Sequence, residues 1–111
     1  MTHALSQIAT AVGAQFGGVT PAQISSRRRP RSTSRARAVT LYVARSELGM
    51  SYSELGAQVN VSLAAAYEAV CRVAEAIVSA DPQILAAIAA GERVATELNE
   101  ELAQLRAMGG E

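Results

Sequence analysis

Residues 52–71, YSELGAQVNVSLAAAYEAVC, constrain the fold more than any other part of this chain. Gly56 is small enough for two helices to cross closely, and Asn60, four residues later, is able to take the left-handed conformation of a tight turn. Apolar positions flank both residues, at Leu55, Val59, Val61, Ala66 and Val70. The pattern predicts a helix-turn-helix, a motif whose second helix enters the major groove of DNA, although any tightly turned helix pair can imitate it.

The rest of the chain also favours helix. Half of the 111 residues are apolar and only 4% are aromatic, a composition that disfavours sheet, so we expect an all-α fold. Apolar spacing and breakers predict helices over residues 4–16, 21–25, 34–47, 52–59, 63–80, 82–90 and 92–108, with Gly91 separating the last two. Thr20 and Ser62 are expected N-caps, and Ser51 with Glu54 is an expected capping box.

The formal net charge of zero hides a strong asymmetry along the chain. Residues 1–46 contain seven arginines and no acidic residue, whereas residues 47–111 contain three arginines and ten acidic residues. This division suggests a polyanionic partner for the first part. The side chains expected at DNA phosphates or a narrow minor groove are Arg27, Arg28, Arg29 and Arg31 in a loop around Pro30, then Arg35 and Arg37 on the next helix. A solvated basic loop is the alternative, but the run adjoins the predicted helix-turn-helix and has no compensating acid.

The order of these features resembles the C-terminal DNA-binding domain of the bacterial replication initiator DnaA, a Trp-repressor-like helix-turn-helix. In that family an apolar helix precedes F-x-V-T-x-x-x-I/L, a basic loop, R-x-R-Q-x-A-M-Y-L-A-R-E-L and S-L-x-E-I-G. Here the corresponding stretches are FGGVTPAQI, RARAVTLYVARSEL and SYSELG, and the resemblance covers residues 8–78. It implies a DnaA-like multi-helix DNA-binding domain over residues 1–79, followed by an acidic helical extension over residues 80–111.

The resemblance also implies roles for individual arginines. The family's minor-groove arginine corresponds to Arg29, and family arginines that lie along the phosphate backbone correspond to Arg31, Arg35 and Arg37. The family's ATPase module is not indicated. The chain has no lysine, so it has no G-x-x-x-x-G-K-[ST] loop.

The sequence departs from the family where DnaA reads bases. The family's recognition helix opens with G-R-D-H-T-T-V, whereas this chain has NVSLAAA, one residue shorter. The side chains expected at the major groove are therefore Ser62, Leu63, Ala64, Ala65, Tyr67 and Glu68. Leu63 and the alanines suit thymine methyl groups, although core packing at the helix start is the alternative for Leu63. Because few of these side chains are polar, we expect affinity to be largely electrostatic or shape-based.

Nothing in the sequence indicates catalysis. His3 stands alone near the N-terminus, and no His, Cys or carboxylate cluster has metal-ligand spacing. Cys71, the single cysteine, has no CxxC partner and is expected to be a small buried residue. We therefore expect a protein that is not an enzyme and uses no cofactor or metal. The N-terminal residues lack a basic secretory region and no apolar span suits a membrane, so we expect a cytoplasmic, nucleoid-associated protein.

The C-terminal residues have a different character. Residues 81–111 carry six acidic residues against Arg93 and Arg106. Their apolar edge consists of Val94, Leu98, Leu102 and Leu105. This amphipathic segment has three alternatives: it folds back on the domain, forms a homodimer, or docks RNA polymerase or another transcription protein.

Taken together, the residues and the resemblance favour a regulator that binds double-stranded DNA. We therefore expect a small transcriptional regulator. Stand-alone modules of this resemblance are associated with phage-like and gene transfer agent clusters, where they act as activators, so an activator of such a cluster is one option, although no motif here singles it out. The arginine-rich loop would contact the backbone and minor groove, and the helix-turn-helix the major groove. The alternatives are a protein-interaction adaptor with a degenerate DNA-binding domain and a modulator of replication initiation.

Overall fold

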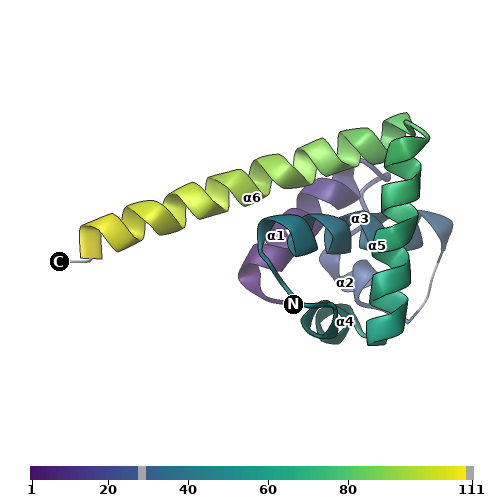
Figure 1. Cartoon of the computed structure of the whole chain (residues 1–111), viewed down its shortest axis with the longest axis horizontal. Helices are drawn as coiled ribbons and strands as arrows, with labels where there is room; N and C mark the ends of the chain where they lie inside the picture. Colours follow the sequence, from purple (N-terminus) through teal and green to yellow (C-terminus); the bar gives the residue numbers. More distant parts are fainter. Residues whose placement is uncertain (28–29, 110–111) are drawn as a thin grey trace.

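The computed structural model describes residues 1–27 and 30–109, and within them the chain is helical without strands (Figure 1). Six helices follow one another: α1 (His3–Ala14), α2 (Pro21–Ile24), α3 (Arg31–Glu47), α4 (Tyr52–Val59), α5 (Leu63–Val78) and α6 (Pro82–Gly109). The expected all-α fold is confirmed.

Side-chain caps explain where most of these helices begin. The Thr20 hydroxyl accepts a hydrogen bond from the Gln23 N–H, and Ser51 does the same for the Glu54 N–H. At both sites the third helical residue returns a bond to the N-cap backbone, which completes a capping box. Ser62 accepts from the Ala65 N–H at the start of α5. The caps expected at these three starts are confirmed.

The core lies where α1, α3 and α6 pack together, with α5 covering α3 and α4 packed on α5. Its buried side chains are Leu5, Ile8 and Val12 of α1, Val39, Leu41 and Val43 of α3, and Ile84, Ala87 and Ile88 of α6. These side chains bring three helices into one core, and α3, whose buried residues lie on more than one face, is at its centre.

Helix α3 begins three residues earlier than the sequence suggested. The prediction began it near Ser34, but Pro30 is the N-cap, with φ −56° and ψ 154°, and Arg31 is the first helical residue. A proline fits directly before the first turn because the N–H that it lacks has no partner there anyway. Arg31 therefore belongs to the helix and not to the loop.

The predicted break at Gly91 is wrong, because α6 runs through it without interruption. Gly91 serves close packing instead. A Cβ at this position would lie 3.0 Å from a methyl carbon of Val12 and 3.1 Å from one of Val43. The missing side chain lets α6 approach α1 and α3 closely, and the surrounding helical residues keep the backbone regular.

Helix α6 has two halves with different surroundings. From Ile84 to Ala95 its apolar face is buried against the rest of the chain, whereas Leu102 and Leu105 are exposed. Figure 1 shows this second half projecting from the packed helices. The domain boundary expected after residue 79 falls in the turn between α5 and α6, where Ala80 has φ 56°.

Candidate DNA-binding surface

The turn between α4 and α5 has the geometry of a helix-turn-helix. Asn60 is left-handed, with φ 60° and ψ 41°, and ends α4 as predicted. A Cβ on Gly56 would lie 2.6 Å from the Val61 carbonyl oxygen, so the two helices approach more closely than any other residue would allow. The Asn60 side chain donates to the Ser25 carbonyl at 2.9 Å. This bond ties the turn to the end of α2, just before the arginine run.

The start of α5 presents mostly small and apolar side chains to solvent. Leu63 is 56% exposed and Tyr67 51% exposed, and Ala64 and Glu68 are exposed as well. The alternative of core packing for Leu63 is therefore excluded. Ala65 is half-buried. The Ser62 hydroxyl accepts the Ala65 N–H, so its own O–H remains able to donate to a base or a phosphate.

Tyr67 belongs to a small cluster with Tyr52 and Arg45. The Tyr52 and Tyr67 rings meet edge to face with centroids 5.3 Å apart, and the Arg45 guanidinium lies 4.6 Å from the Tyr52 ring centroid. The Cys71 thiol, by hydrogen bonding and charge, raises the pKa of Tyr67, with Tyr52 adding to the effect. A phenol is protonated at neutral pH even at its ordinary pKa of 10.0, and this shift acts in the same direction. Cys71 is half-buried and not fully buried as expected.

The predicted arginines lie in different environments. Arg27 and Arg31 are exposed, while Arg28 and Arg29 lie outside the described residues, so the expected minor-groove position of Arg29 stays a prediction. Arg35 makes an ion pair with Asp81, with 2.9 Å between Nη2 and Oδ2. Its guanidinium also lies 5.8 Å from the Phe16 ring centroid.

The Arg35–Asp81 pair joins the start of α3 to the start of α6. Asp81 also caps α6, because its Oδ1 accepts the backbone N–H groups of Gln83 and Ile84. The Ile84 N–H, and after it the Arg35 guanidinium, hold the pKa of Asp81 below its usual value, although partial removal from water acts in the opposite direction. Asp81 is therefore ionised at neutral pH and keeps Arg35 in place.

Arg37 does not lie on the surface where the sequence placed it. The residue is only 5% exposed. Its Nε donates to the Ile24 carbonyl at 2.7 Å and its Nη2 donates to the Ser26 carbonyl at 3.0 Å. The fork of the guanidinium donates to two carbonyls, one at the last residue of α2 and one two residues beyond it. In this position Arg37 anchors the chain before the arginine loop.

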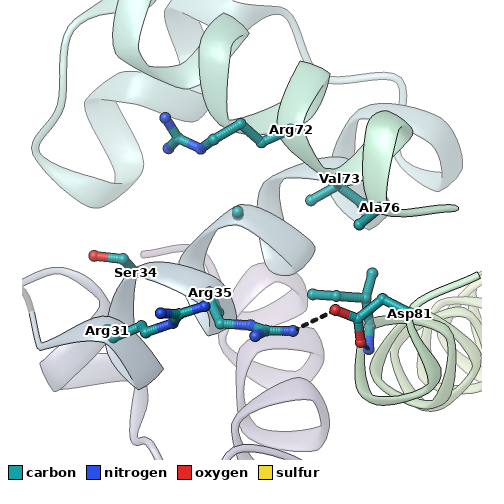
Figure 2. Close-up of a pocket in the computed structure, with 9 residues that line it drawn as sticks. Arg31, Ser34, Arg35, Arg72, Val73, Ala76 and Asp81 are labelled. Atoms are coloured by element: carbon teal, nitrogen blue, oxygen red, sulfur yellow. Dashed lines mark hydrogen bonds and ion pairs between the residues drawn. The ribbon is translucent and has the colours of Figure 1, made fainter. Parts of the chain in front are cut away.

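The sequence reasoning missed Arg72 of α5. Arg72 lies across an open cavity of about 470 Å³ from Arg31 and Arg35 (Figure 2). The sequence spacing indicates its position. Ala65, Ala69 and Arg72 are four and three residues apart, so they share the face of α5 that borders a smaller hollow beside α3. A search for arginines on that face would have found Arg72.

Metal centres and membrane-crossing helices are two further classes of site. Residues 1–27 and 30–109 hold no group of three His, Cys, Asp or Glu side chains suited to a metal ion. None of the helices there is by itself long and apolar enough to cross a membrane, although α5 and α6, bent by 115°, satisfy that criterion as a pair.

The left-handed turn, the close crossing at Gly56 and the exposed start of α5 define a helix-turn-helix DNA-binding domain. A family model described as bacterial dnaA protein helix-turn-helix matches residues 5–73, and the chain belongs to this family. The match spans α1 to α4 and most of α5, so α6 lies outside it. No curated protein and no solved structure matches the chain. The family identifies the chain as a DNA-binding protein whose partner is double-stranded DNA.

Proposed function

We propose that this protein is a transcriptional regulator that binds double-stranded DNA and performs no catalysis. The observation that carries the proposal is the combination of an exposed, apolar recognition-helix start with arginines beside it. A helix that offers Leu63 and Ala64 to the major groove suits thymine methyl groups and provides few hydrogen bonds to bases. Recognition would therefore depend on backbone contacts and DNA shape.

The arginine run would supply the backbone contacts. Arg27 and Arg31 are exposed on either side of the loop, and Asn60 and Arg37 fix the chain that leads into it. In the proposed complex Arg28 and Arg29 lie between these points, and Arg29 enters the minor groove while its neighbours contact phosphates.

A salt titration of DNA affinity tests the electrostatic part. If about 4–6 phosphates are contacted, log K should fall against log salt with a slope of about −4 to −5. A flat dependence, or no binding to any duplex, would refute the proposal. Genome-wide mapping of bound DNA, combined with expression changes after deletion, would then show whether the bound sites are promoters and whether the effect is activation.

The projecting half of α6 supports a second part of the proposal, a docking face for a transcription protein. Leu102, Leu105 and Met108 are exposed on it, and residues 96–109 carry three glutamates against Arg106. Apolar side chains between acidic ones suit an amphipathic helix with basic flanks. Two copies of this segment would bring the glutamates together, so a different protein, such as RNA polymerase, fits better than a homodimer.

Charged substitutions on α6 separate docking from DNA binding. Leu105→Glu should abolish regulation in a reporter strain while the affinity of the purified protein for DNA stays unchanged. Ala107→Glu adds the same charge on the exposed helix outside the leucine edge and should have no effect. Sedimentation of the unmodified chain and of Leu105→Glu at several concentrations tests for a dimer. A dimer that forms in the unmodified chain and is lost in Leu105→Glu would assign the apolar face of α6 to a second copy of the chain and refute docking of a transcription protein.

A further inference from the structure

Three arginines from two helices line one cavity beside the helix-turn-helix. Arg31 and Arg35 come from the first turns of α3, and Arg72 comes from the second half of α5. Figure 2 shows Arg72 on the wall opposite Ser34, with Asp81 at one end of the cavity. This arrangement places three cations around a space of about 470 Å³ with a single carboxylate.

The charges of this cavity are not balanced from within. Asp81 is the only acid among its lining residues, and it is occupied by Arg35 and by the N-terminus of α6. Across the described residues neither the Arg31 nor the Arg72 side chain makes a hydrogen bond or an ion pair. Guanidinium groups that line one cavity, two of them without an anion, suit a phosphate, because each presents several N–H donors in a fixed plane.

The floor of the cavity is apolar. Ala38 of α3, Val73 and Ala76 of α5, and Ile84 of α6 form it. A phosphate attached to a sugar matches this lining better than a free inorganic ion does, since the sugar C–H groups can rest on the apolar floor while the arginines hold the phosphate oxygens.

We infer that this cavity is a phosphate-binding site, formed by Arg31, Arg35 and Arg72, for a backbone phosphate of bound DNA. The inference rests on the proposed mode of DNA binding and adds α5's Arg72 to it. Arg31 follows the arginine loop directly, so a strand contacted by the loop passes close to the cavity. Arg72 then binds the same phosphate from the recognition helix α5, so that α3 and α5 contact one DNA strand from two sides.

Asp81 competes with DNA for Arg35. In the free protein its Oδ2 lies 2.9 Å from Arg35 Nη2, and a phosphate in the cavity would take over part of that contact. Asp81→Asn keeps an oxygen to cap α6 but removes the competing charge. We expect this variant to bind DNA more tightly, by up to about fivefold.

The decisive experiment is the salt dependence of DNA binding by Arg72→Gln. Loss of one phosphate contact should make the slope of log K against log salt less negative by about 1. It should also weaken binding about fivefold at physiological salt, equally for specific and random duplexes. Arg93→Gln is the matched control, because it removes one exposed arginine of α6 outside the cavity and should leave the slope unchanged.

A second arm asks whether the phosphate belongs to a free nucleotide. Arginine Nε–H NMR signals of the full chain are followed while inorganic phosphate or a nucleoside monophosphate is added. Saturable nucleotide shifts that Arg72→Gln abolishes, with an unchanged DNA salt slope, would support the phosphate site but assign it to a nucleotide. An unchanged slope without such shifts would overturn the inference. If the protein bound no duplex, the proposed function would fail, and the nucleotide arm alone would decide the site.

Discussion

At the residue scale, Gly56 controls the helix crossing on which the DNA-binding surface depends. Its absent side chain leaves room for the Val61 carbonyl, which would otherwise lie 2.6 Å from a Cβ. That neighbour is backbone of the turn, directly before the N-cap of α5, so it cannot move aside without moving α5. The small residue that the sequence singled out is required by contact with main chain and not with a flexible side chain.

Gly56→Ala should therefore destabilise the protein although alanine is the better helix former. Overpacking against backbone should outweigh the gain in helix propensity and leave a net loss of about 1–2 kcal/mol in the free energy of unfolding. Gly109→Ala is the control, because a Cβ there meets nothing within 4 Å. Chemical denaturation measures both, and equal stability of the two variants would contradict the packing argument.

Arg37 shows how an arginine in a basic run can act inside the protein. Arg37→Met keeps much of the volume but leaves the Ile24 carbonyl, bonded at 2.7 Å, without its donor. We expect a loss of about 2–4 kcal/mol, since hydrogen bonds to charged groups contribute more than neutral ones. Arg93→Met, at an exposed position, should change stability by less than about 0.5 kcal/mol.

The salt dependence of DNA binding gives Arg37 a second test. If Arg37 contacts no phosphate, Arg37→Met should keep the slope of log K against log salt at a temperature where the variant is folded. A slope that is less negative by about 1 would instead assign Arg37 a direct phosphate contact.

At the element scale, the local signals located the helix starts that have side-chain caps, but they missed the uncapped start of α3 and the continuity of α6. Thr20, Ser51 and Ser62 each act within their own first turn, so their capping was readable from sequence. Gly91 was misread because glycine ends a helix in isolation, whereas here Val12 and Val43 press against it from helices far away in the chain. Burial of Arg37 and the approach of Arg72 to α3 also depend on tertiary packing, which no spacing rule specifies.

The capping box of α4 makes part of the stability depend on pH. Backbone and side-chain hydrogen bonds from Ser51 hold the pKa of Glu54 below its usual value of 4.5. A lowered folded-state pKa means that the stabilisation is present above pH 4.5 and is lost as the pH falls through the folded value.

Glu54→Gln should remove this dependence, because a glutamine amide can still accept the Ser51 N–H without titrating. Acid titrations followed by circular dichroism should show a smaller loss of stability below pH 4.5 in the variant than in the unmodified chain. Identical acid profiles would show that the cap contributes nothing to acid sensitivity.

At the scale of the whole molecule, α6 belongs to the core over its first half only. A chain that stops after Glu97 loses exposed residues and half-buried Leu98, so we expect it to lose only about 1 kcal/mol. A chain that stops after Asp81 loses buried Ile84, Ala87, Ile88 and Ala95. The two isoleucines alone are worth about 2–5 kcal/mol each, which approaches the full stability of a small domain.

Thermal unfolding of the two truncated chains checks this division. The shorter chain should show no cooperative transition, and the longer one should melt within a few degrees of the full chain. A strongly destabilised longer chain would mean that the projecting half also supports the fold.

The direction of α6 gives this neutral protein a permanent electric dipole moment. The helix starts directly after Asp81, which lines the same cavity as Arg31, Arg35 and Arg72. Its 28 residues extend for about 42 Å towards an end rich in glutamate. The peptide dipoles of α6 point the same way, positive at the start and negative at the end. Near DNA, the electric field of the phosphates would exert a torque that turns the arginine end of the protein towards the DNA before any contact forms. A chain without net charge would thus arrive already oriented, and salt would slow its arrival by shortening the range of that torque.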